Sequence, residues 1–169
     1  MKTLPSVSQW LDHFAACVRN RDLRQGRKLF DPKVRAFGTR AEQAGDLADL
    51  EEHQWRRVWF NTRGFRFLHE TVTQLISDDG SLICVLALWD SEGLNPDDQT
   101  FVRRGRCTIA LRREASSPLG YVAIHTHFSK NAAGRTLMVQ VGRCSKSGTP
   151  RLANPPGRGN RKIAGNQNE

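Results

Sequence analysis

The longest uninterrupted apolar run of the chain is Leu82-Ile83-Cys84-Val85-Leu86-Ala87-Leu88-Trp89. The run lacks the polar and apolar alternation of a strand that has one face in water, so we expect a strand covered on both faces. It is far shorter than the roughly 20 residues that cross a bilayer, so we expect no membrane-spanning segment. The rest of the chain can cover one face, and a second copy of the protein is the simplest cover for the other.

On both sides of this run, polar and apolar residues alternate as they do in a half-exposed strand. Upstream, Asp78-Asp79-Gly80 predicts a tight turn in which Gly80 supplies a positive φ, and this turn joins the run to a strand over residues 64–76. Downstream, looser turns separate strands over residues 101–112 and 120–129. The four strands together predict an antiparallel meander.

Helical periodicity dominates the N-terminal part of the chain. Ser6 can cap a helix over residues 7–20, whose apolar side chains fall on one stripe: Val7, Trp10, Leu11, Phe14 and Val18. Two more helices are expected over residues 22–30 and 46–60, separated by a short strand over residues 34–38. Helices followed by a meander predict an α+β domain in which the helices pack on a curved antiparallel sheet.

Composition divides the 169 residues into two parts. All 13 aromatic residues lie between Trp10 and Phe128, so we place the folded domain at residues 1–130. Residues 130–169 hold 8 Lys and Arg against Glu169 alone. We expect residues 131–169 to be a mostly disordered tail, rich in Gly, Arg, Asn and Pro, which at most binds nucleic acid without specificity through its charge.

The cysteines and the N-terminus indicate a cytoplasmic protein. Four cysteines occur without a C-x-x-C pair, and we expect them to be reduced and mostly buried: Cys17, Cys84, Cys107 and Cys144. Polar residues interrupt the first apolar segment, so we expect no signal peptide.

The segment around His125 and His127 is the most pointed candidate for chemistry. Alternation along a strand places both histidines and Ser129 on one face. The pair can act as general acid or base, or can simply pack as structural histidines. A metal site would need a third ligand, for which Cys107 and Glu70 are the candidates, and we assign no metal.

Arg106 is the second candidate, because it lies inside a strand where its guanidinium can bind a carboxylate with two hydrogen bonds. The alternative is an ion pair with Glu70 or Asp90. Trp59 and Trp89 can line a small-molecule pocket or belong to the core. Motifs for dinucleotides, nucleoside triphosphates, serine hydrolases and zincins are absent from the sequence, and we expect no cofactor.

The chain contains, in this order, six further segments of note: Leu29 to Gly38, Gln54-Trp55 with Trp59, Gly64-Phe65, Trp89, Gly105 to Thr108, and Tyr121 to Ser129. In order and spacing these segments resemble the SnoaL-like branch of the nuclear transport factor 2-like superfamily. The last segment is also similar to the end of the calcium/calmodulin-dependent protein kinase II association domain. The resemblance implies a cone-shaped α+β domain with a cavity under the helices, and usually a homodimer formed through the sheet.

The resemblance also implies roles for individual residues. Arg106 matches an arginine that faces the cavity in association-type members, and His125 and His127 match their terminal histidines. Ketosteroid-isomerase-like members carry a base carboxylate where this chain has Phe37 and Gly38. This difference counts against proton abstraction from a steroid-like ketone.

Two functions follow as expectations. The first is a binding domain whose cavity holds a small organic anion or an apolar metabolite and is lined by Trp59, Trp89, Arg106, His125 and His127. The second is an isomerase, dehydratase or cyclase in which His125 or His127 is the general acid or base and Arg106 stabilises developing negative charge. The sequence leaves open whether the protein is an enzyme.

Overall fold

The computed structural model describes residues 6–131, which begin with two helices and a strand. Helix α1 spans Val7–Asn20 and begins with the expected cap, in which the Ser6 hydroxyl accepts a hydrogen bond from the backbone N–H of Gln9. Helix α2 is shorter than expected, Leu23–Arg27, and strand β1 occupies Phe30–Phe37. Pro32 is tolerated within β1 because this strand lies at the edge of the sheet.

The expected helix over residues 46–60 is a chain of four short helical segments. They are α3 (Leu47–Leu50), a π-helical turn η1 (Glu51–Trp55), α4 (Arg56–Val58) and a 3₁₀ turn η2 (Trp59–Asn61). In the π turn the backbone N–H of Arg56 donates to the carbonyl of Glu51, five residues earlier. The side chains of the same two residues form an ion pair at 2.5 Å, which fits this wider turn.

Four long strands complete the domain: β2 (Thr62–Ile76), β3 (Leu82–Leu94), β4 (Thr100–Arg113) and β5 (Tyr121–Lys130). The sheet order is β1-β5-β4-β3-β2, and the four long strands pair antiparallel as expected. Gly80 has the predicted positive φ of 66° in the turn between β2 and β3. Strand β1 pairs in parallel with β5, so the sheet is mixed, a pairing that the sequence did not predict.

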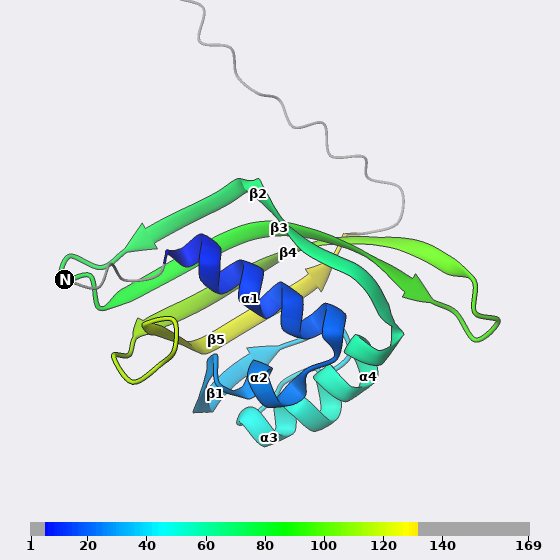
Figure 1. The fold of residues 1–169 in the computed structure, drawn as a ribbon, viewed down its shortest axis with the longest axis horizontal. Coiled ribbons are helices and arrows are strands. Elements are labelled where there is room, and N and C mark those ends of the chain that lie inside the picture. The colour runs from blue at the N-terminus through cyan, green and yellow to red at the C-terminus, as the bar shows by residue number, and fades with distance from the viewer. Residues whose placement is uncertain (1–5, 132–169) are drawn as a thin grey trace, which may run out of the picture. The chain divides into compact units, whose positions relative to one another are not determined.

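The helices lie on one face of the curved sheet, which we call the inner face (Figure 1). Strand alternation directs Val85 of β3 and Ile109 and Leu111 of β4 toward the helices, and all three are fully buried. Leu86 points to the opposite, outer face and is 39% exposed. The run over residues 82–89 is therefore apolar on both faces, and the described residues cover only the inner one.

Three of the four cysteines lie in the described part of the chain, and their thiols are free. Burial raises the pKa of Cys17 to about 11 and that of Cys107 to about 12, so both thiols stay protonated. Cys144 and the expected tail over residues 131–169 lie outside the described residues, apart from residue 131. Between residues 6 and 131, no helix is long and apolar enough to cross a membrane.

Candidate functional site

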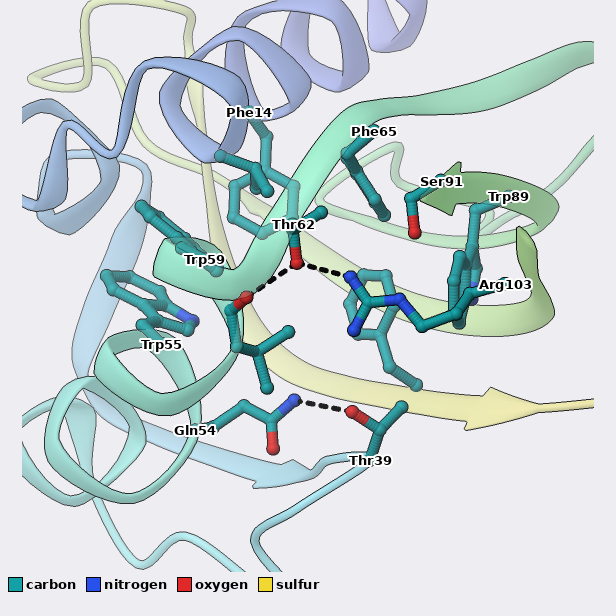
Figure 2. Close-up of a pocket in the computed structure, with 13 residues that line it drawn as sticks. Phe14, Thr39, Gln54, Trp55, Trp59, Thr62, Phe65, Trp89, Ser91 and Arg103 are labelled. Carbon is teal, nitrogen blue, oxygen red and sulfur yellow. Dashed lines mark hydrogen bonds between the residues drawn. The ribbon is translucent and has the colours of Figure 1, made fainter. Parts of the chain in front are cut away.

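A cavity of about 50 Å³ lies between the helices and the inner face of the sheet (Figure 2). Aromatic rings make up much of its wall: Phe14, Trp55, Trp59, Phe65, Trp89 and Phe128. The remaining lining side chains are those of Val18, Thr39, Gln54, Val58, Thr62, Ser91 and Arg103. Since one ordered water needs about 10–15 Å³ of such space, the cavity accepts a group of the size of a few water molecules, such as a short-chain carboxylate.

Trp55 and Trp59 form one wall of the cavity. Their rings stack with centroids 4.6 Å apart, and the edge of Phe14 meets Trp59 at 5.9 Å. Gly26 of α2 makes this packing possible, because a Cβ at residue 26 would lie only 2.7 Å from the Trp59 ring. Because residue 26 has no side chain, the Trp59 ring can lie directly against α2.

Arg103 enters the cavity from β4 and is partly buried. One terminal nitrogen donates to the Thr62 hydroxyl at 2.5 Å and to the backbone carbonyl of Glu92 at 3.3 Å. The Thr62 hydroxyl in turn donates to the carbonyl of Val58, so the guanidinium has one orientation (Figure 2). Its Nε is buried and has no hydrogen-bond partner among the described residues.

The charge of Arg103 is likewise uncompensated. Within residues 6–131 no carboxylate lies within ion-pair distance of it. Burial lowers the pKa of Arg103, and the positive charge of Arg40 lowers it further. A buried cation is costly without a counter-charge, so the cavity is electrostatically suited to an anion.

Ser91 supplies a second unsatisfied polar atom. It belongs to β3, is only 5% exposed, and its Oγ has no partner among the described residues. Ser91 pairs with Arg103 across the β3–β4 ladder, so the two side chains project from neighbouring backbone positions into the same space (Figure 2). A hydroxyl donor beside a guanidinium is a suitable arrangement for binding a carboxylate.

Gln54 fixes the loop that closes another side of the cavity. Its Oε1 accepts hydrogen bonds from the backbone N–H groups of Arg40 and Ala41, at 2.9 and 3.0 Å. Its Nε2 donates to the Thr39 hydroxyl at 3.1 Å (Figure 2). Gly38 allows the close approach, because a Cβ there would lie 2.3 Å from the Gln54 oxygen.

The structure separates the five residues that the sequence grouped into one cavity. Trp59 and Trp89 line the inner cavity. Arg106, His125 and His127 do not, because their side chains lie on the outer face of the sheet. The prediction of one cavity lined by all five is wrong, since it placed the even-numbered positions of β4 on the inner face.

Arg106 and His127 instead border a shallow groove of about 270 Å³ on the outer face. Arg106 Nε donates to the Ser129 hydroxyl at 3.3 Å, and the expected ion pair with Glu70 or Asp90 is not formed. Asp90 pairs with Arg66 at 2.8 Å. The rings of His125 and His127 meet Phe37 edge-on at 5.9 and 5.7 Å.

A metal site at these histidines gains no support from the described residues. Cys107 faces the buried side of the sheet, opposite to the histidines. No group of three or more His, Cys, Asp or Glu within residues 6–131 is placed to hold a metal ion.

Sequence reasoning missed Arg103, although its signal was present. Cys107, Ile109 and Leu111 are bulky and apolar, while Thr108 and Ala110 between them are smaller or polar. This alternation indicates that odd-numbered positions of β4 face the core. By the same parity, Arg103 points inward and Arg106 outward. Ser91 had no comparable signal, because an isolated serine near a strand end is common.

The curved sheet, the helices on one of its faces and the cavity between the two layers define a class of α+β domains with an internal cavity. The family model described as the SnoaL-like domain matches residues 7–133, and the chain belongs to this family. The predicted resemblance to SnoaL-like proteins is thereby confirmed.

Solved structures show the same fold. A nuclear transport factor 2-like superfamily protein from Salmonella enterica serovar Typhimurium has a TM-score of 0.64 at 14% identity, with 78% of this chain and 93% of that chain covered. The S. rosetta CaMKII hub has a TM-score of 0.60 at 18% identity, with 74% and 94% covered. A ketosteroid isomerase-like protein from Erwinia carotovora atroseptica has a TM-score of 0.62 at 10% identity, with 75% and 94% covered. No curated protein matches the chain.

Proposed function

We propose that this protein binds a small organic acid in the inner cavity, with the carboxylate on Arg103 and Ser91 and the carbon chain against the aromatic wall. The observation that carries the proposal is the pair of buried, unpartnered polar atoms, Arg103 Nε and Ser91 Oγ, on two neighbouring residues that line one otherwise largely apolar cavity. Buried polar groups are nearly always hydrogen-bonded, so a pair without partners at a cavity wall marks a place for a ligand or ordered water.

Binding is favoured over catalysis by the chemistry of the cavity wall. Among its described lining residues, Arg103 is the one with an ionisable side chain. General acid and base catalysis requires a group that exchanges protons near neutral pH, and an arginine does not. The predicted alternative, an enzyme with a cavity histidine, lacks its catalytic group here because His125 and His127 lie on the outer face.

We further propose that the protein is a cytoplasmic homodimer in which a second copy covers the outer face. The outward side chains of β3 support this proposal, because Leu82 and Leu86 are 38% and 39% exposed. An exposed apolar face on a sheet is typical of an interface. The hub named among the similar structures is consistent with assembly in this fold. The free thiols of Cys17, Cys84 and Cys107 support a reducing compartment.

The binding proposal is tested by titrating butyrate into the wild-type protein and into Arg103→Gln by calorimetry, in a buffer free of carboxylate and phosphate. We expect Arg103→Gln to weaken binding about 10- to 100-fold, since it removes a charge-assisted contact. The variant should stay folded, because no described carboxylate loses a partner. Arg104→Gln is the matched control, since Arg104 is the next residue on β4 and points to the outer face. Equal butyrate affinity in all three proteins would contradict the proposal.

A further inference from the structure

Three positive residues occupy neighbouring backbone positions at the mouth of the cavity, which we define by its partly exposed lining residues Thr39, Val58, Arg103 and Phe128. Arg40 follows Thr39 in the loop that Gln54 holds. Lys130 lies two residues after Phe128 on β5, and alternation places it on the same inner face. It pairs with Gly105, two residues from Arg103 on the neighbouring strand. Three separate segments thus bring a cation to one opening.

The three charges affect one another. Desolvation of the ammonium group by its neighbours lowers the pKa of Lys130 most, and the charges of Arg103 and Arg40 lower it further. The pKa of Arg103 is lowered by burial and by Arg40. None of the three forms an ion pair with a carboxylate within residues 6–131. Like charges in proximity repel, so their convergence disfavours the empty site and favours an anion.

We infer that the ligand is a short dicarboxylate, with one carboxylate inside the cavity on Arg103 and Ser91 and the second at the mouth between Arg40 and Lys130. This inference rests on the proposed function and adds the number and spacing of charges on the ligand. A monocarboxylate on Arg103 leaves two of the three cations without a counter-ion, whereas a dicarboxylate supplies an anionic group to each region.

The size of the cavity is compatible with one carboxylate inside it and the second at its mouth. The cavity accepts a group of the size of a few water molecules, so an acid whose first carboxylate is on Arg103 can place its other end at the mouth. There it meets Arg40, which is exposed, and Lys130, which is also exposed. The inner contact therefore provides most of the affinity, and the outer contacts, which solvent screens, provide the preference for a second charge.

The test compares succinate with butyrate, which have the same number of carbons and differ in one terminal carboxylate. Both acids are titrated at neutral pH into wild type, Arg40→Gln/Lys130→Gln and Arg104→Gln. We expect wild type to prefer succinate by about 3- to 20-fold, a preference that falls as salt is added. The double variant should weaken succinate binding more than butyrate binding and so lose the preference for succinate. Arg104→Gln should retain it.

The outcomes separate this inference from the proposed function. If butyrate and succinate bind wild type equally well, the inference is overturned and the proposed function stands. If Arg104→Gln abolishes the preference as fully as the double variant, net charge alone explains it and the inference also fails. If neither acid binds, the proposed function fails and the inference fails with it.

Discussion

Arg103 and Arg106 lie three positions apart on β4, and this separation decides their roles. An odd separation along a strand places two side chains on opposite faces. Arg103 therefore reaches the cavity and the Thr62 hydroxyl, while Arg106 reaches the outer groove and Ser129. The electrostatics of the cavity depend on the first of these two arginines, although both lie in the same dense group of positive charges.

Glu51 shows how one buried carboxylate links the helices next to the cavity. Its side chain is 11% exposed and accepts hydrogen bonds from Arg27 at 2.6 Å and Arg56 at 2.5 Å. The hydrogen bond from Arg27 has the largest effect and lowers the pKa of Glu51, burial opposes it, and the hydrogen bond from Arg56 lowers the pKa further. The ionised form is thus favoured in the folded protein.

This shift predicts how stability depends on pH. Because the folded-state pKa is lowered, the stabilisation from Glu51 is fully present above its unfolded pKa of about 4.3 and is lost as the pH falls through the lower folded value. We expect Glu51→Gln to lower the unfolding free energy by roughly 1–2 kcal/mol at neutral pH, since the hydrogen bonds lose their charge. Denaturant unfolding at neutral pH and at several acidic pH values measures both proteins. A constant difference across the acidic range would contradict this account of Glu51.

At the scale of elements, the sequence predicted those parts that depend on local periodicity. The first helix and its cap, the turn at Gly80 and the antiparallel pairing of the long strands follow from apolar spacing and turn chemistry. The parallel pairing of β1 with β5 depends on how distant segments meet, and no local pattern encodes it. The π turn at Glu51–Trp55 was missed for a similar reason, because the apolar stripe of this segment also fits a regular α-helix.

The candidate site could be predicted in part. Trp59 and Trp89 were candidates because a tryptophan side chain can line a small-molecule pocket as well as the core, and both line the inner cavity. The choice of arginine failed because the face of β4 was assigned from the resemblance, whereas the alternation of Cys107, Ile109 and Leu111 gives the opposite assignment. Ser91, Gln54 and Thr39 depend on tertiary contacts, which a single sequence does not reveal.

At the scale of the whole molecule, the outer face predicts self-association. We expect light scattering at micromolar concentration to give about twice the chain mass of 19.1 kDa. Leu86→Glu should give a monomer, because Leu86 points outward from the middle of β3 and a charge there would be buried at the interface. Ala48→Glu, on the exposed side of α3, is the control and should leave the mass unchanged. A wild-type mass of one chain would exclude the dimer.

The location of a bound acid tests the central claim most directly. The claim is that the inner cavity, and not the outer groove, is the binding site. In a crystal structure of the protein with butyrate, we expect the carboxylate at hydrogen-bond distance, about 2.7–3.2 Å, from Arg103 Nε and Ser91 Oγ, with the alkyl chain against the aromatic wall. Butyrate found instead beside Arg106 and His127 on the outer face, with the inner cavity empty, would contradict the claim.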